Sequence, residues 1–274
     1  MAVGHFNISD LVALRAIFEA ARELGVPVMI GTSEGEGDFI GRKPAAALVR
    51  GLREEFDYPI FLNSDHTKNL EKVEEAVAAG YDEILFDGSK LHFEENVRQT
   101  KEVVEYVKSI NPNILVEGEI GYIGSSSEVR KEIPEGAAIR PEDLTKPEEA
   151  KQFVYETKVD MLAPAVGNLH GMFAEAPDPN LDIERIRLIK DATKVTLVLH
   201  GGSGNTDEDF KAAIQAGVGV IHINTEIRLA WRRGLESGLK ANPDEVAPYK
   251  ILPSAFAEVR GVVLRRLKLF NNLV

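Results

Sequence analysis

Three of the six histidines in this 274-residue chain lie at or shortly after the end of a short apolar run. They are His66, His170 and His200, and a carboxylate, Glu119, ends another run of the same kind. Imidazole and carboxylate donors suit Zn²⁺, and they also suit Co²⁺ or Fe²⁺. The chain has no cysteine, so any metal must be held by His, Asp or Glu. Because widely separated histidines lack the spacing of a specific metal motif, a structural role is the alternative.

A second candidate site is the glycine-rich segment 200–204, which reads HGGSG and is called the phosphate loop here. It precedes Thr206, where a helix is expected to begin. Backbone N–H groups at such a turn can bind a phosphate near a helix N-terminus. Asn224 and Thr225 end the next apolar run and are expected beside it. The alternative is a plain turn in which glycine supplies a left-handed backbone.

The composition limits the partners of the chain. Hydrophobic residues make up 44% and charged residues 28%, which is typical of a globular protein with a large core. The formal charge of −12 disfavours both nucleic acid and an anionic membrane surface as partners. The first residues, MAVGHFNISD, do not resemble a secretory signal, and no apolar run approaches the ~20 residues of a membrane span. We therefore expect a cytoplasmic protein.

Apolar runs and helical segments alternate along the chain. Eight runs rich in Val, Ile and Leu read AVGHFN, VPVMIGTS, PIFLNSD, EILFDGS, ILVEGEIG, MLAPAVG, TLVLHGGSG and VIHINTE. The segments between them have helical spacing, and roughly 30 residues per unit is the size of a βα repeat. This order predicts an α/β fold, a single (β/α)8 TIM barrel over residues 1–274 with a helical extension from about residue 253. An open, doubly wound parallel sheet is the alternative.

Local signals mark several boundaries. Helix starts are predicted at Thr145, with Glu148 three residues on, and at Thr206, with Asp209; helix ends are predicted at Gly80 and Gly217. The segment 122–144 is long for a loop in such a fold, so it is expected to cover a functional site.

Polar residues gather where the predicted strands end. In a TIM barrel these ends share one face, where the chemistry takes place. The side chains expected there are Asn7, Ser33, Asp65, His66, Asp87, Glu119, Asn168, His170, His200 and Asn224. The remaining histidines include His5, inside the first run, and His92, at a helix start; both are interpreted as structural.

Several of these runs carry a family pattern, in the same order. AVGHFN is similar to the AVGAFN of class II fructose-bisphosphate aldolases, SDHT to LDHG, EILFDGS to SVMIDGS, HFEENVRQT to PFEENIAKT, and EGEIG to EAELG. VGNLHGMF is similar to IGTSHGVY, and LVLHGGSG matches almost letter for letter. From about residue 2 to residue 230, the chain thus resembles this metal-dependent family, which includes tagatose-bisphosphate aldolases.

The resemblance implies roles for individual residues. It makes His66, His170 and His200 the zinc ligands, with Glu119 as a metal-site carboxylate and Asp87 a polar residue near the metal. Asp65 takes the place of the aspartate that moves a proton at the substrate hydroxyl, and Glu128 is the candidate acid on the long loop. The residues implied in substrate or phosphate binding are Asn7, Ser33, Gly171, Gly201, Ser203, Asn224 and Thr225.

The implied reaction is the reversible cleavage of a ketose bisphosphate, expected to be fructose 1,6-bisphosphate, into dihydroxyacetone phosphate and an aldehyde phosphate. Zn²⁺ would spread the carbanion charge as an enediolate, Asp65 would take the proton of the C4 hydroxyl, and Glu128 would protonate the enediolate. None of the predicted strand ends carries a lysine for the rival Schiff-base mechanism. The resemblance also implies a homodimer or higher homo-oligomer.

Two departures from the family pattern leave alternatives open. Ala174 stands where the family has a lysine that helps to hold phosphate, and His222 stands where it has an asparagine. His222 is either a hydrogen-bond donor to the enediolate or a buried histidine of the barrel interior. The departures motivate an alternative function, a phosphosugar-binding barrel with little turnover. A metal-assisted hydrolase is disfavoured, since the first run lacks a His-x-His pair.

Overall fold

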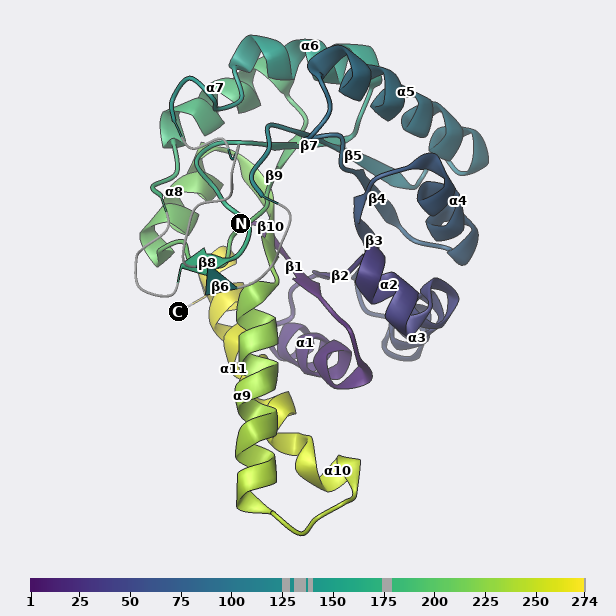
Figure 1. The fold of residues 1–274 in the computed structure, drawn as a ribbon, viewed down its shortest axis with the longest axis vertical. Helices are drawn as coiled ribbons and strands as arrows, with labels where there is room; N and C mark the ends of the chain where they lie inside the picture. Colours follow the sequence, from purple (N-terminus) through teal and green to yellow (C-terminus); the bar gives the residue numbers. More distant parts are fainter. Residues whose placement is uncertain (125–128, 131–136, 138–139, 174–178, 274) are drawn as a thin grey trace.

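The eight apolar runs form parallel strands that close into one barrel in a computed structural model of the protein (Figure 1). The structure describes residues 1–124, 129–130, 137, 140–173 and 179–273. The barrel strands are β1 (Val3–Asn7), β2 (Val28–Ser33), β3 (Ile60–Thr67), β4 (Glu83–Phe86), β5 (Leu115–Ile120), β7 (Met161–Pro164), β9 (Thr196–Leu199) and β10 (Val218–Ile223). They pair in the order β1-β10-β9-β7-β5-β4-β3-β2, which confirms the predicted TIM barrel.

Helices surround the barrel and connect its strands (Figure 1). They are α1 (Leu11–Leu24), α2 (Glu34–Ile40), α3 (Arg42–Phe56), α4 (Leu70–Ala79), α5 (Phe93–Ile110), α6 (Pro147–Thr157), α7 (Ile183–Thr193), α8 (Asp207–Ala216), α9 (Thr225–Ala241), α10 (Pro248–Ile251) and α11 (Pro253–Phe270). The end of α9 and α10 project from the barrel, whereas α11 returns to pack against α1 and α9. None of the described helices is long and apolar enough to cross a membrane.

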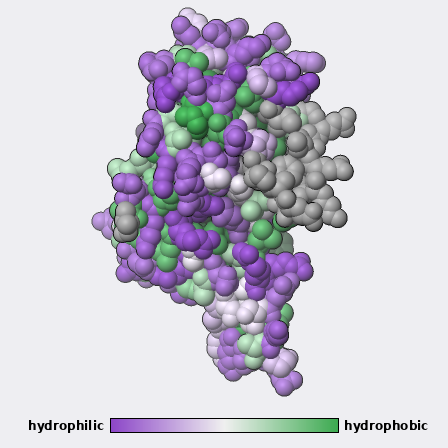
Figure 2. Space-filling model, turned by 90° about the vertical axis from the view of Figure 1, so that its left-hand side faces the viewer, coloured by the Kyte–Doolittle hydropathy of each residue, from purple (hydrophilic) through white to green (hydrophobic). Residues whose placement is uncertain are grey.

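The main hydrophobic core lies between the strands and the surrounding helices. Its fully buried members include Ile30 of β2, Ile84 of β4 and Phe153 of α6. The inside of the barrel is different, because His5, Asn63 and other polar side chains are fully buried there. Buried polar groups are costly unless they have partners, so this polar interior indicates a functional site. The outer face in Figure 2 is mostly hydrophilic, with apolar residues scattered over it.

Most of the predicted helix boundaries are confirmed. The capping box of Thr206 with Asp209 begins α8, and Gly80 and Gly217 follow the ends of α4 and α8.

The predicted start at Thr145 is wrong, since α6 begins at Pro147 and Glu149 accepts a hydrogen bond from the N–H of Lys146. Thr145 is buried instead. Its hydroxyl donates to the carbonyl of Ile120 and accepts from the N–H of Ala165, and so it links the ends of β5 and β7.

The long segment after β5 is described in part. Its residues Val129–Arg130 form β6, which pairs in parallel with β8 (Met172–Phe173). The expected acid Glu128 and the departure Ala174 both lie outside the described residues.

Candidate metal centre

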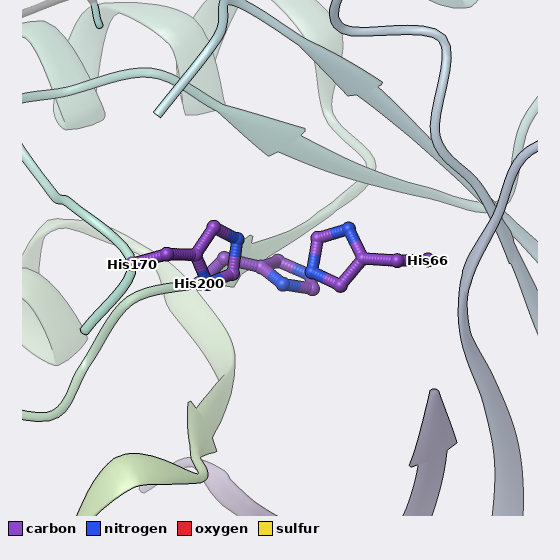
Figure 3. Close-up of side chains that lie close together, drawn as sticks. All are labelled: His66, His170 and His200. Atoms are coloured by element: carbon purple, nitrogen blue, oxygen red, sulfur yellow. The ribbon is translucent and has the colours of Figure 1, made fainter. Parts of the chain in front are cut away.

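Three histidine side chains point toward one another at the C-terminal end of the barrel (Figure 3). His66 comes from the end of β3, His170 from the segment after β7, and His200 directly follows β9. One ring nitrogen from each lies within 4.8 Å of the others. The ring centroid of His66 is 4.7 Å from that of His170 and 4.9 Å from that of His200. These three residues are called the histidine cluster below.

In two of these rings a hydrogen bond occupies one nitrogen and leaves the other nitrogen free. His66 Nδ1 lies 3.0 Å from a carboxylate oxygen of Asp87, and His200 Nε2 lies 2.8 Å from one of Glu117. His66 Nε2, His170 Nε2 and His200 Nδ1 are buried without a hydrogen-bond partner among the described residues. A carboxylate that holds the second nitrogen of a histidine is the usual outer support of a metal ligand. The donor set therefore fits a divalent cation such as Zn²⁺.

The backbone at His66 is strained, and the strain goes with a bulge that redirects the His66 side chain. Its φ angle is +51°, in the left-handed region that few non-glycine residues adopt. The register between β3 and β4 shifts between Ser64 and Thr67, which marks a bulge at this point. Such bulges redirect a side chain, and strain of this kind is concentrated at functional sites. The bulge turns the His66 ring toward the other two histidines.

Acidic side chains surround His66 and set its charge. Neither oxygen of Glu119 has a hydrogen-bond partner in the described part of the chain, and burial raises the pKa of this carboxyl. Burial alone would lower the pKa of His66, but Asp65 and Glu119 raise it well above its usual value. His66, Asp87 and Glu119 also form a second group of three possible ligands. A divalent cation would replace the positive charge of His66 and release its proton.

Glu117 and Glu83 are functional candidates that sequence analysis missed. Both are fully buried inside the barrel, and burial raises the pKa of each well above its usual value. Glu117 holds His200, and Glu83 accepts a hydrogen bond from Asn63 Nδ2. The spacing of Glu117 and Glu119 was an available signal, because residues two apart in a strand face the same side. That face is the barrel interior.

The support from Glu117 gives a testable prediction. Replacing Glu117 with Ala leaves the Nε2–H of His200 without its partner, so we expect metal affinity to fall about 10–100-fold, the usual cost of losing such a support. Competition with a coloured chelator measures this affinity. Glu102→Ala, on the exposed face of α5, is the matched control. Unchanged affinity in Glu117→Ala would show that Glu117 does not support a ligand.

Asp65 is held in place beside the histidine cluster. One of its oxygens, Oδ2, accepts a hydrogen bond of 2.8 Å from Asn7 Nδ2, and Oδ1 lies 3.5 Å from His222 Nδ1. Burial alone would raise the pKa of Asp65, but the positive charge of His66 and the nearby ring of His222 hold it well below its usual value. Asp65 is thus an ionised, oriented carboxylate.

Two adjoining cavities define the space around these groups. The first is lined by Asn7, Asp65, His170, Gly171, His200, Gly201, Gly202, Ser203, His222, Asn224 and Thr225. The second, of about 320 Å³, is lined by Ser33, Glu34, Gly35, Asp65, His66, Lys68, Asp87, His170, Asn224 and Arg228. Because the cavities share Asp65, His170 and Asn224, they form one elongated site. A larger hollow of about 710 Å³, on the outer surface at α1 and α3, contains no histidine.

The phosphate loop forms one end of this site. Gly201 has a φ of +61°, and a Cβ there would come within 2.3 Å of the carbonyl oxygen of Leu169. Glycine is therefore required where the loop meets the segment after β7. Ser203 Oγ accepts a hydrogen bond from the N–H of Glu226, in the first turn of α9. Gly171, Gly201, Ser203 and Thr225, which the resemblance places around one phosphate, line the same cavity.

The helix that faces this cavity differs from the expected one. The phosphate loop leads to α8, but the first turn of α8 carries three acidic residues, Asp207, Glu208 and Asp209, and the capping box occupies the N–H groups of Thr206 and Asp209. These acidic groups would repel a phosphate. Thr225, the first residue of α9, lines the cavity instead, and the side chain of the N-cap residue Asn224 does not cap this helix, although Ser203 Oγ accepts from the N–H of Glu226. The N-terminus of α9 therefore provides the helix N–H groups for an anion.

The second cavity brings two cationic side chains into the site. Lys68 and Arg228 line it together with Ser33, and the carboxylate of Glu34 also lines it. Glu36 is buried and accepts hydrogen bonds from Arg228 Nη2, at 2.6 Å, and from Ser33 Oγ, at 2.9 Å. This network fixes the guanidinium of Arg228 on the cavity wall, where it can bind an anionic group.

Comparisons with known proteins match this chain to aldolases. The family model described as "Fructose-bisphosphate aldolase class-II" matches residues 1–273. A fructose-bisphosphate aldolase from Geobacillus stearothermophilus is 34% identical over 274 residues, which cover 99% of this chain and 92% of the relative. A 6-phospho-5-dehydro-2-deoxy-D-gluconate aldolase from Shouchella clausii is 34% identical over 273 residues, 98% of this chain and 89% of that relative. The crystal structure of the YdjI aldolase from Escherichia coli K12 superposes with a TM-score of 0.80 at 29% identity and covers 98% of this chain and 91% of that one.

Proposed function

The chain belongs to the class II fructose-bisphosphate aldolase family, and we propose from this premise that it reversibly cleaves a ketose bisphosphate. The first candidate substrate is fructose 1,6-bisphosphate, which would give dihydroxyacetone phosphate and an aldehyde phosphate. One observation carries the proposal: the histidine cluster lines two adjoining cavities, of which one is bounded by the phosphate loop and the other holds the cationic side chains of Lys68 and Arg228. A substrate with an anionic group at each end and a reactive carbonyl between them matches this arrangement.

The residues that would hold the metal are His66, His170 and His200, with Glu119 and Asp87 beside them. Zn²⁺ is the first candidate, and Co²⁺ or Fe²⁺ suits the same donors. When bound, the cation supplies positive charge that stabilises the carbanion left by cleavage of the carbon–carbon bond. The buried nitrogens without partners support this assignment, since unsatisfied buried polar atoms are costly.

The remaining steps belong to the residues of the chain. The phosphate loop and the first turn of α9 bind the phosphate next to the ketone, and Lys68 and Arg228 bind the anionic group at the other end. Asp65 accepts the proton of the substrate hydroxyl as the bond breaks, while Asn7 keeps its carboxylate oriented. Glu128 is the proposed acid that protonates the product carbanion.

The second candidate substrate is 6-phospho-5-dehydro-2-deoxy-D-gluconate, which the name of the Shouchella clausii relative specifies. It carries a phosphate at one end and a carboxylate at the other. The guanidinium of Arg228 can pair with either group in a bidentate geometry. The two substrates therefore differ at the end of the site that Lys68 and Arg228 line.

A homodimer is the proposed assembly. The end of α9 and α10 project from the barrel and expose apolar side chains, among them Leu239 and Tyr249. The family resemblance supports the dimer, and this projecting surface is where we propose a second copy to bind.

Metal removal tests the proposed function. We expect protein with bound metal to cleave fructose 1,6-bisphosphate, to lose this activity in a chelator, and to regain it when Zn²⁺ is restored. The measurement couples the release of dihydroxyacetone phosphate to NADH oxidation, with metal content determined in parallel. Chelator-resistant cleavage would contradict the metal-dependent mechanism. If metal is bound but neither candidate substrate is cleaved, the phosphosugar-binding barrel becomes the better interpretation.

A further inference from the structure

Two residues that depart from the family pattern lie in contact inside the barrel. His5 stands in AVGHFN where the family pattern has an alanine, and His222 stands where it has an asparagine. β1 and β10 are neighbouring strands, and the two residues pair in register. Their rings stack with centroids 3.4 Å apart and planes within 4° of parallel. The two substitutions thus form a single structural unit.

The His5 ring is fixed from its far side. It is fully buried, and Nε2 lies 2.9 Å from Asn63 Oδ1. Because Asn63 uses its amide N–H₂ to donate to Glu83, its oxygen accepts the hydrogen of His5 Nε2. Burial lowers the pKa of His5 to about 4, so the ring is neutral and its hydrogen is on Nε2. Gly31 makes room for it, since a Cβ there would lie 2.2 Å from His5 Cε1.

The His222 ring faces the substrate side of this stack. It lines the first cavity together with Asp65, and its Nδ1 lies 3.5 Å from Asp65 Oδ1. Nδ1 is the ring nitrogen that faces a carboxylate oxygen of Asp65, and a carboxylate only accepts hydrogen bonds, so the hydrogen of this imidazole is expected on Nδ1. Neither nitrogen of His222 has a hydrogen-bond partner among the described residues, so Nε2 is free to accept a hydrogen bond. The N–H of His222 thus faces Asp65 rather than the enediolate.

We propose that His5 is a positioning residue that fixes the ring plane and the tautomer of His222. In that tautomer, His222 donates from Nδ1 to the carboxylate of Asp65 and offers Nε2 as an acceptor to a hydroxyl of the sugar. Asp65 then has both oxygens oriented, Oδ2 by Asn7 and Oδ1 by His222. The inference rests on the proposed aldolase function for its kinetic consequences and on the geometry alone for the state of the ring.

A second metal site at this place is the competing interpretation. His5, Asp65 and His222 each offer an atom within 4.8 Å of the others. However, the lone pair of an imidazole nitrogen lies in the plane of its ring, and the lone pairs of two parallel stacked rings lie in separate parallel planes that do not meet. Metal ligands must direct their lone pairs at one point. The stack is therefore suited to orienting a ring and not to holding an ion.

A double-mutant cycle tests the kinetic part. If His5 acts only through His222, His5→Ala displaces the His222 ring slightly. We then expect kcat to fall about tenfold, with little change in KM. The same change in a His222→Asn background has no further effect, since the double variant restores the alanine and asparagine of the family pattern. Met29→Ala is the matched control, because Met29 pairs with His5 from β2 and is also buried. Multiplicative effects of the two changes on kcat would overturn the proposal.

His5→Phe covers the case in which His5→Ala does not fold. It keeps a flat ring over His222, so we expect it to retain more of kcat than His5→Ala does, and it can replace that variant in the cycle. A His5→Phe enzyme as slow as His5→Ala would contradict positioning by stacking.

The nitrogen chemical shifts of His222 provide a readout that is independent of aldolase activity. In protein labelled with ¹⁵N-histidine, we expect His222 to show a single neutral tautomer, and His5→Ala to show a mixture of both. The same tautomer in both proteins would refute the positioning role even if the substrate proposal is correct. Loss of a second equivalent of metal from His5→Ala would instead favour the metal site and overturn the inference. If the tautomer shifts but no tested sugar is cleaved, the positioning holds and the proposed function fails.

Discussion

Replacing His66 with Ala is expected to abolish both metal binding and cleavage. The variant loses one of three buried nitrogens that converge on one point, and it loses the ring that contacts Asp87 and Glu119. Removal of an outer support costs about 10–100-fold in affinity or activity, so loss of a ligand itself should cost more, roughly 10³-fold or greater in turnover. Metal content by mass spectrometry and the cleavage rate check the two parts separately.

His92→Ala is the matched control for this variant. His92 is also a histidine at the junction of a strand and a helix, but it is exposed and its side chain does not cap α5. Metal content and turnover should stay at the level of the unmodified protein. Retention of a full equivalent of metal by His66→Ala would refute the assignment of His66 as a ligand, whatever happens to the rate.

Asp65→Ala is expected to keep the metal and to lose turnover. The loss should be ~10²–10⁴-fold in kcat, the usual contribution of a positioned general acid or base. Metal should stay bound because the three free nitrogens of the histidine cluster remain, whereas the hydrogen bond of Asp65 comes from Asn7. Steady-state kinetics measure kcat, and metal analysis of the same protein measures the bound metal.

The isosteric variant Asp65→Asn separates the charge from the shape of this side chain. It still offers an oxygen to Asn7 but cannot accept a proton, so its kcat should fall as far as that of Asp65→Ala. Asp191→Ala, an exposed position on α7, is the control for a change of one negative charge. Near-normal kcat in Asp65→Asn would exclude Asp65 as the base and point to another acceptor at the hydroxyl.

The sequence alone determined the order of the elements and the residues at one end of the barrel. Apolar runs separated by helical segments predict parallel strands, and parallel strands in a barrel place their C-terminal ends on one face. His66, His170 and His200 lie at or shortly after the ends of three different runs, so their approach follows from topology without any knowledge of side-chain contacts. The capping box at Thr206 was predictable for a similar reason, because it depends on residues three apart.

Only the tertiary structure decided which polar side chains meet inside the barrel. The link from Glu117 to His200 spans 83 residues, and the stack of His5 on His222 depends on the register between the first and last barrel strands. Thr145 bonds across β5 and β7 instead of beginning a helix, and α9 rather than α8 lines the cavity beside the phosphate loop. Local sequence patterns indicate helix or strand propensity and hydrophobic periodicity over only one or two turns of the chain. The contacts inside a closed barrel depend on strand register and shear, which are fixed only when all eight strands pack together.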